Sequence, residues 1–309
     1  MCTMKKKFQM IGFALSVLLV TLPIVTVGAD NAASGKQKKE KTTESALGVK
    51  PVTGSWINLA YKDVRNKYTN PQSFDNMDPK LWEAKVRELS AMGIEYLVLM
   101  EVANEGKSYY PSQIMPWWYN KDKKSPVDAI LDEAAKHNMK IFMSSGWAKD
   151  QDDNLLDPAI KERQLQIMEE LASLYKNHKA FYGWYLPVED CLCPIFAEHA
   201  VQSVNTLSEK AKKLAPGKKT LISPYGIGLS EFDNPEYEKQ MQKLKVDIIA
   251  YQDEVGCVRD QFTLPRLKKN WQRLRDIHNR LNIEMWANCE TFTWEEGTND
   301  RTSALIPAA

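Results

Sequence analysis

The 309-residue sequence has almost no net charge, because 41 Lys and Arg residues are matched by 40 Asp and Glu residues. A chain so balanced has no overall positive field of the kind that nucleic-acid-binding domains use to attract phosphate groups. The composition therefore predicts no nucleic-acid partner.

Glycine-rich phosphate turns and metal-ligand spacings are also missing. No expected strand is followed by the pattern G-x-G-x-x-G of dinucleotide-binding folds. Histidines are few, and all four fall on expected helices or at their ends, without the spacing of ligands to a transition metal. We expect no cofactor and no bound metal; the four are His137, His178, His199 and His278.

Cysteine is sparse, and four cysteines follow residue 29: Cys191, Cys193, Cys257 and Cys289. The Cys-x-Cys pair is too closely spaced to bridge itself comfortably, and the zinc-ligand spacings are absent. Three interpretations remain open: disulfides in an exported protein, a zinc site, or small buried apolar residues.

The N-terminus has the pattern of a secretory signal. Lys5 to Lys7 form a positive region, an apolar run covers Ile11 to Val27, and small residues lead to Ala29. This pattern predicts a signal peptide over residues 1–29, with an uncleaved membrane anchor as the alternative. We expect export to the periplasm or the extracellular space, without stable membrane insertion after cleavage.

A polar, lysine-rich segment follows the signal and has no apolar period. It predicts a flexible linker over residues 30–50, which leaves 51–309 as one folded domain.

From residue 54 onward, short apolar runs alternate with longer amphipathic ones, which predicts parallel strands connected by helices. We expect strands at 54–61, 94–102, 140–147, 181–186, 219–225, 246–251 and 283–288. The expected helices are 79–92, 126–137, 158–177, 194–214, 234–244 and 263–281, with another beginning at 302.

This alternation predicts a (β/α)8 TIM barrel rather than an open doubly wound sheet, because chemically active residues follow almost every strand. Seven strands are found where a closed barrel needs eight. The sequence is therefore expected to be truncated before the eighth strand, and the alternative is an open barrel with an exposed edge.

Two carboxylates at strand ends suggest catalysis. Glu189 and Asp190 follow the fourth strand, and Glu290 follows the seventh. Glycoside hydrolysis needs one acid to protonate the leaving oxygen and a second to attack the anomeric carbon or activate water. We assign Glu189 as acid/base and Glu290 as nucleophile; a separation of about 5–5.5 Å would predict retention, and about 6.5–9.5 Å inversion. The alternative is that both acids form structural ion pairs.

Other polar and aromatic residues near the strand ends are candidates for substrate binding. Trp117 and Trp118 lie in a polar loop, and a role in the hydrophobic core does not readily explain tryptophans there. We therefore expect these two residues to be the best platforms for a sugar ring. Trp184, Trp82 and Trp271 are expected in the core. The remaining candidates are Asn58, Glu101, Trp147, Tyr251, Asp253, Glu254, Asn288 and Trp294. Glu101, Asp190, Asp253 and Glu254 also suggest a less favoured metal-assisted hydrolase.

Four segments carry a resemblance to a known family: GSWINLAY, LWEAKVRELSAMGIEYLVL, FYGWYLPVED and DIIAYQDEVG followed by W-x-N-x-E-x-F. They resemble a secreted bacterial domain family of unknown function, DUF4434, regarded as a TIM barrel similar to glycoside hydrolases. The resemblance covers about residue 51 to the end. Family members normally continue into an eighth strand, which agrees with the expected truncation.

The wider resemblance is to the retaining-glycosidase clan, which implies the same roles for Glu189 and Glu290. That clan usually has Asn directly before the acid/base Glu, whereas this sequence has Val188; Asn58 or Asn288 would have to supply the contact. We therefore expect an exported glycoside hydrolase acting on an oligo- or polysaccharide, with a non-catalytic carbohydrate-binding barrel as the alternative.

Overall fold

The computed structural model describes residues 51–59, 77–149, 153–255 and 263–290, and the backbone of 292–294 and 303–305. The predictions for the signal peptide, the linker, Cys257 and the side chain of Trp294 lie outside these described residues.

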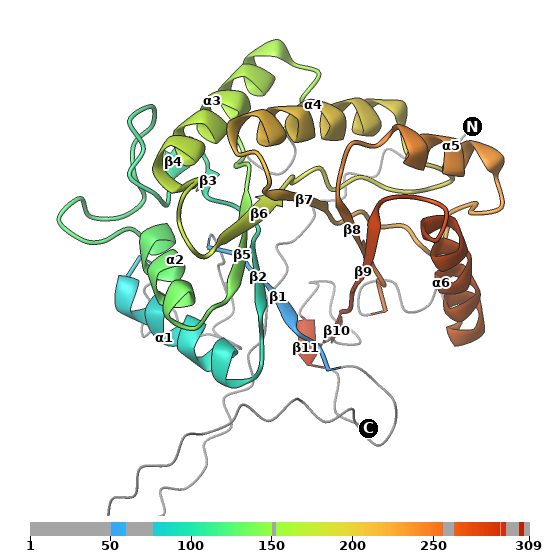
Figure 1. The fold of residues 1–309 in the computed structure, drawn as a ribbon, viewed down its shortest axis with the longest axis horizontal. Helices are drawn as coiled ribbons and strands as arrows, with labels where there is room; N and C mark the ends of the chain where they lie inside the picture. Colours follow the sequence, from blue (N-terminus) through green and yellow to red (C-terminus); the bar gives the residue numbers. More distant parts are fainter. Residues whose placement is uncertain are drawn as a thin grey trace, which may run out of the picture.

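Seven parallel strands form one sheet in the centre of the domain (Figure 1). Each strand lies where the alternating pattern predicted one, and its amino end agrees within two residues. The pattern is visible in the sequence because strands covered on both faces are apolar runs. In sheet order they are β1 (Gly54–Ile57), β2 (Tyr96–Leu99), β5 (Lys140–Ser144), β6 (Phe181–Tyr185), β7 (Lys219–Ile222), β8 (Ile248–Gln252) and β9 (Glu284–Asn288).

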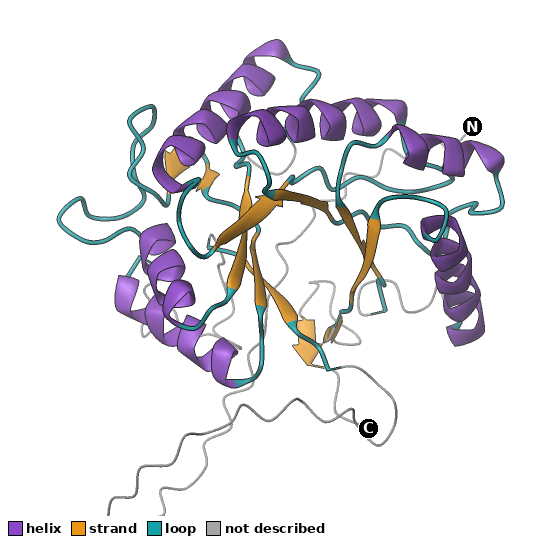
Figure 2. Cartoon of the chain, viewed as in Figure 1, coloured by secondary structure: helices purple, strands orange, loops and turns teal. Residues whose placement is uncertain are grey.

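Helices surround the sheet on its outer side (Figure 2). Most begin at a side chain that caps the helix and is followed by Pro. Asp78, Ser125, Asp157 and Asn234 each accept a backbone N–H from the first turn. The helices are α1 (Pro79–Ala91), α2 (Pro126–Lys136), α3 (Pro158–Tyr175), α4 (Glu198–Leu214), α5 (Pro235–Lys243) and α6 (Leu264–His278).

Two differences from the prediction go beyond shifts of an element's carboxyl end. Helix α4 begins at Glu198 rather than at residue 194, because the preceding chain is engaged with the loop after β7: Leu192 N–H donates to the Tyr225 carbonyl, and Glu231 N–H to the Pro194 carbonyl. The helix expected from residue 302 is wrong. β11 (Ser303–Leu305) pairs antiparallel with β10 (Phe292–Trp294), and so short an apolar run does not distinguish strand from helix.

The long connection after β2 contains a small hairpin, β3 (Ala103–Asn104) and β4 (Lys107–Ser108). Three contacts from Glu170 on α3 fix the following segment: its carboxylate accepts the Tyr110 hydroxyl at 2.7 Å, the Ser112 hydroxyl at 2.6 Å and the Gln113 N–H. The loop that carries the two adjacent tryptophans is therefore held on a helix.

The sheet curls until its two ends approach each other. Trp286 on β9 packs against Tyr96 on β2, with ring centroids 5.1 Å apart, and against Phe142 on β5 at 5.7 Å. A flat sheet would hold β9 several strands away from β2 and β5. The fold is thus a curled, seven-stranded parallel (β/α) barrel. In its described strands, β1 and β9 are the two ends and are not paired with each other.

Gly183 permits close packing within this barrel. A Cβ atom at this position would lie 2.6 Å from the Lys219 carbonyl oxygen and 2.6 Å from the Phe142 ring. Only glycine therefore fits here without a shift of the neighbouring strand or ring.

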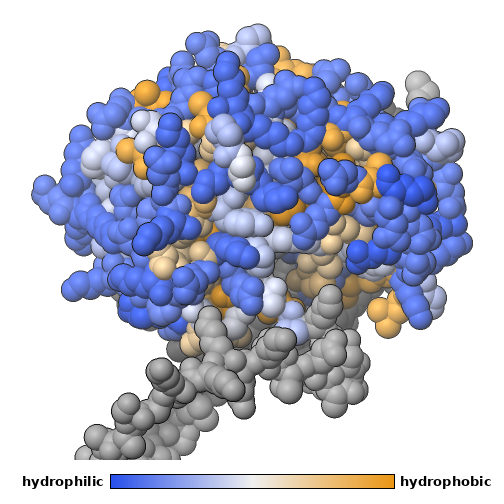
Figure 3. All heavy atoms as spheres, in the orientation of Figure 1, coloured by the Kyte–Doolittle hydropathy of each residue, from blue (hydrophilic) through white to orange (hydrophobic). Residues whose placement is uncertain are grey.

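Hydrophilic residues cover most of the face shown in Figure 3, and apolar residues appear there as separate patches. Within the described ranges, none of the helices combines the length and apolar character that crossing a bilayer requires.

Candidate active site

Glu189 lies in the loop that follows β6, close to the carboxyl end of that strand. The hydroxyl of Tyr185, the last residue of β6, donates a hydrogen bond of 2.9 Å to Glu189 Oε1. Tyr185 is fully buried in the barrel interior, and Glu189 is half-buried. Burial raises the pKa of Glu189 to about 7, although the Tyr185 hydrogen bond opposes the shift. A carboxyl group with this pKa holds a proton for part of the time near neutrality, as a general acid must.

Asp190, the next residue, is used in a different way. Its Oδ2 lies 2.9 Å from His199 Nε2 on α4, and its Oδ1 accepts the Cys191 N–H at 2.7 Å. Asp190 therefore fixes the loop to the start of α4.

The loops after β8 and β9 are joined by Asp253. The strands pair in register up to Gln252 opposite Asn288, so the residues beyond them emerge side by side. Asp253 Oδ1 accepts the Glu290 N–H at 3.0 Å, and the Asp253 N–H donates to the Asn288 carbonyl at 3.0 Å. This bonding places Glu290 directly beside the β8 loop, and burial raises the pKa of Asp253.

Glu254 follows Asp253 and is almost enclosed, with 8 % of its surface exposed. Its Oε2 accepts the Gly226 N–H at 2.7 Å. Burial raises the pKa of Glu254 to about 7; the bond from Gly226 opposes the shift, and the negative charge of Glu290 adds to it. The backbone of Glu254 has φ +54°, a left-handed conformation that is uncommon for residues other than glycine and costs roughly 1–3 kcal/mol.

Tyr225, in the loop after β7, is a site residue that sequence reasoning missed. It is half-buried, and its pKa rises to about 12 because of burial and of the nearby acidic groups Cys191, Asp190, Glu189 and Glu254. Tyr225 thus lies near acids from both the β6 and the β8 loops. The available signal was a polar aromatic residue at the carboxyl end of the strand predicted at 219–225.

Glu101 and Asn58 extend the site to β2 and β1. Glu101 is fully buried. The pKa of Tyr185 is raised mainly by burial and by the charge of Glu189, and the charge of Glu101 adds a smaller contribution. Glu101 therefore lies near the tyrosine that holds Glu189. The Oδ1 of Asn58 is buried and accepts no hydrogen bond from the described residues.

The loop tryptophans are largely engaged by the protein. Trp117 Nε1 donates to the Ser112 carbonyl at 2.7 Å, and its ring stacks on Tyr119 at 5.1 Å. Trp118 Nε1 donates to the Asn104 carbonyl at 3.1 Å, and its ring stacks on Tyr109 at 6.2 Å. Both remain half-buried, so only part of each ring is open to a ligand.

Trp147, in the loop after β5, is 6 % exposed, and its indole N–H has no hydrogen-bond partner among the described residues. A buried N–H without a partner carries a desolvation cost, and a bound hydroxyl group would offset that cost. Trp147 therefore remains a candidate for contact with a polar ligand.

Tyr251 is placed away from the site. Its side chain faces the helices, where the hydroxyl lies 2.8 Å from His278 Nε2 and 3.2 Å from the Tyr237 hydroxyl. Side chains alternate along a strand, so Tyr251 points outward while Ala250 points into the barrel. The structure thus places the Tyr251 side chain on the helix side of the sheet, apart from the predicted substrate-binding residues at the strand ends. By contrast, Trp184, Trp82 and Trp271 pack in or against the helix-side core, as predicted.

Val188 stands where the glycosidase pattern has asparagine, and Asn288 is one of the two residues expected to supply the missing contact. Asn288 Nδ2 donates to the Ser223 hydroxyl at 3.0 Å, which links the ends of β9 and β7. Val188 packs against the helix-side core. The amide group that precedes the acid in that pattern is therefore replaced here by an apolar packing contact.

No group of three or more His, Cys, Asp or Glu side chains in the described part of the chain has the arrangement of a metal site. The proposed set of Glu101, Asp190, Asp253 and Glu254 thus does not converge on one point. Cys191 and Cys289 carry free thiols, and burial raises the pKa of each to about 11.

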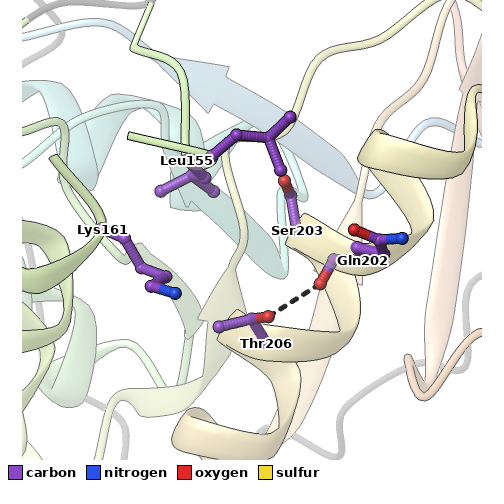
Figure 4. Close-up of a pocket in the computed structure, with 6 residues that line it drawn as sticks. Leu155, Lys161, Gln202, Ser203 and Thr206 are labelled. Carbon is purple, nitrogen blue, oxygen red and sulfur yellow. Dashed lines mark hydrogen bonds between the residues drawn. The ribbon is translucent and has the colours of Figure 1, made fainter. Parts of the chain in front are cut away.

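A separate surface cavity of about 140 Å³ lies between α4 and the start of α3 (Figure 4). It contains none of the acids described above, and within it Thr206 Oγ1 donates to the Gln202 carbonyl at 2.8 Å. Its lining residues are Leu155, Leu156, Lys161, Gln202, Ser203 and Thr206.

Comparison with protein families gives one match: the profile described as "Domain of unknown function (DUF4434)" matches residues 52–308. No curated protein matches the chain significantly.

Comparison with solved structures identifies similar folds. The structure described as "a putative alpha-L-fucosidase from Bacteroides thetaiotaomicron VPI-5482" has a TM-score of 0.63 and 18 % identity, over 90 % of this chain and 84 % of the other. A glycoside hydrolase family 5 protein from Bacteroides vulgatus ATCC 8482 has a TM-score of 0.48 and 12 % identity, over 74 % and 50 % of the two chains. At 18 % identity the first of these similarities shows the fold alone, that of a TIM barrel.

Proposed function

This chain belongs to the DUF4434 family, and from that premise we propose that it is a glycoside hydrolase that cleaves an oligo- or polysaccharide. A fold shared with glycoside hydrolases does not by itself assign an activity. The proposal depends on the acids at the carboxyl ends of the strands.

The observation that carries the proposal is the environment of Glu189. It is a half-buried carboxyl with a pKa raised to about 7, oriented by the Tyr185 hydroxyl, and it follows a strand of the same barrel as Glu290. Glycosidases need two carboxyl groups whose pKa values differ, so that one is protonated while the other is ionised.

In the proposed reaction, Glu189 transfers its proton to the glycosidic oxygen as the bond from that oxygen to the anomeric carbon breaks. A carboxylate oxygen of Glu290 forms a bond to the same carbon. Glu189 then removes a proton from water, whose oxygen displaces Glu290 and restores both residues to their first state. The product keeps the configuration of the substrate.

We also propose that the protein acts after export. The support is the charged and apolar pattern of residues 1–29, followed by the polar segment 30–50. Expression of the full chain with a C-terminal tag, followed by N-terminal sequencing of the exported product, would test this part. A product that begins at residue 30 supports it, and a product that retains residues 1–29 in the cytoplasm contradicts it.

The activity is tested with the chain from residue 30 onward, screened against defined polysaccharides and aryl glycosides of several sugars. We expect turnover of at least one substrate, and its loss in Glu189→Gln and Glu290→Gln. Glu95→Gln is the matched control, because Glu95 is exposed at the amino end of β2. Analysis of the product anomer by NMR reads the stereochemistry. Wild-type activity in both site variants would contradict the assignment.

Val188 favours a second candidate, a carbohydrate-binding barrel without hydrolysis, because the amide that contacts the sugar in the similar clan is missing. Calorimetric titration with the same glycans separates the two. Binding without turnover on any glycan supports the second candidate.

A further inference from the structure

Glu254 and Glu290 lie on adjacent loops at the mouth of the barrel. Their strands pair in register to Gln252 and Asn288, two residues before each acid. Asp253 then ties the two loops through its bonds to the Glu290 N–H and the Asn288 carbonyl. The two acids are thus placed by the same pair of strands.

The local structure holds the Glu254 carboxyl in place at a conformational cost. Its backbone is in the left-handed region at φ +54°, and the Gly226 N–H fixes Oε2 at 2.7 Å. Strained non-glycine residues of this kind persist where the surroundings demand them, and they cluster at functional sites. A residue needed only for packing would gain nothing from a buried carboxyl there.

All titratable groups found to act on Glu254 are acidic. They are Glu290 on the β9 loop and Asp253 on its own loop. Tyr225 on the β7 loop and Cys191 on the β6 loop also lie near Glu254, whose charge helps to raise the pKa of each. Among the described residues, no Lys, Arg or His forms an ion pair with Glu254. Two carboxyl groups in such surroundings do not both ionise readily, so one of them keeps a proton.

Resting on the proposed function, we infer that Glu254 is the neutral acid of the site: it keeps its proton while Glu290 is ionised, and it donates that proton as a hydrogen bond to an oxygen atom of the bound saccharide. The backbone N–H groups of Gly226 and Ile227 hold the carboxyl, and the proton lies on the oxygen that Gly226 does not engage. An uncharged acid in this position binds a sugar hydroxyl or ring oxygen without adding a second negative charge beside the nucleophile.

The protonation part is tested without any substrate. Glutamate carboxyl carbons labelled with ¹³C are titrated by NMR, and the Glu254 signal is assigned from its loss in Glu254→Gln. We expect Glu254 to titrate near pH 7 and to titrate at lower pH in Glu290→Gln, because the neighbouring charge is gone. The Glu95→Gln variant should leave the Glu254 signal unchanged. A Glu254 midpoint below pH 5, or one that Glu290→Gln does not move, overturns the inference.

The hydrogen-bond part uses saccharide binding or turnover. Gln keeps a donor but cannot ionise, so Glu254→Gln should bind at pH 6 as wild type does and should not weaken as the pH rises to 8. Glu254→Leu should weaken binding roughly tenfold at pH 6, because it has no donor. Equal affinity of all three proteins at both pH values overturns the inference. If no glycan is turned over, the proposed function fails, while the NMR titration still decides the state of Glu254.

Discussion

The two ends of the barrel are built from the same strands but in opposite ways. Towards the amino end, the interior is filled by rings: Phe142 meets Tyr182 at 5.3 Å, and Tyr96 meets Trp286 at 5.1 Å. The Lys140 ammonium covers the Tyr96 ring at 4.6 Å and donates to its hydroxyl at 2.9 Å. At the carboxyl end, the interior changes to buried acids whose pKa values are raised.

This difference separates stability from chemistry within one sheet. On β6, Tyr182 packs in the ring cluster, whereas Tyr185, three residues later, orients an acid. Aromatic contacts and buried apolar area stabilise the amino end, while desolvated carboxyls at the other end reduce stability. Substitutions at the two ends should therefore affect different measurements.

The largest effect is expected from Glu189→Gln, which removes the proposed proton donor and should lower kcat by about 10²–10⁴-fold. The melting temperature should stay the same or rise, because a desolvated carboxyl is replaced by a neutral group. Steady-state kinetics and thermal melting measure the two quantities on one sample. A parallel fall in stability and activity would mean that the residue is structural.

Phe142→Ala, at the amino end, should lower stability and leave saccharide binding unchanged. The ring is fully buried among Tyr96, Tyr182 and Trp286, and its removal should lower the free energy of unfolding by about 3–5 kcal/mol. Urea denaturation gives the value. At temperatures where the variant is folded, saccharide affinity should match that of wild type, and a selective loss of affinity would contradict the separation of the two ends.

Gly183→Ala tests the close packing within β6. The added methyl group meets a carbonyl oxygen that cannot easily move, so we expect a loss of about 1–3 kcal/mol in the free energy of unfolding. Gly93→Ala is an informative comparison, because nothing lies within 4 Å of a Cβ atom there and the cost arises only from its φ of +87°. A smaller loss at Gly183 than at Gly93 would contradict the packing argument.

The buried acids predict a pH dependence of stability. Folding raises the pKa of Glu189 and Glu254, so both bind more protons in the folded state than in the unfolded state. Their contribution to the free energy of unfolding is therefore complete below pH 4.5 and is lost as the pH rises through about 7. Glu254→Gln should therefore be more stable than wild type at pH 8, by on the order of 1 kcal/mol, and not at pH 4.5.

Buried His278 has the opposite effect on the pH dependence of stability. Burial lowers its pKa, so its contribution to the free energy of unfolding is lost as the pH falls below 6.5. Comparing Glu254→Gln with wild type at each pH cancels this term. Equal stability of the two proteins at every pH would show that Glu254 ionises normally.

The smallest effect is expected from Lys140→Met, which removes a cation from two rings and a hydrogen bond to Tyr96. The loss should be about 0.5–1 kcal/mol, with no change in affinity or turnover. Denaturation in low and high salt would show the electrostatic part of this loss.

The sequence predicted the seven strands and the six described helices because each is long enough, or apolar enough, to show its period, and because Asp78 and Ser125 mark helix starts. It placed Glu189, Glu254 and Glu290 at strand ends from chain order alone. It did not distinguish inward from outward side chains near those ends. Tyr251 was taken for a site residue and Tyr225 was missed, since the direction of each side chain depends on register and loop path.

Asp253 has a consequence for engineering this barrel. One carboxylate oxygen of Asp253 accepts hydrogen bonds from the N–H groups of both Glu290 and Val255, so the loops after β8 and β9 form a single structural unit. Loops at the mouth of a barrel are often treated as interchangeable parts. Here a new loop after β8 would displace Glu290 unless the β9 loop were transplanted with it, so the unit of exchange in this barrel is the pair of loops.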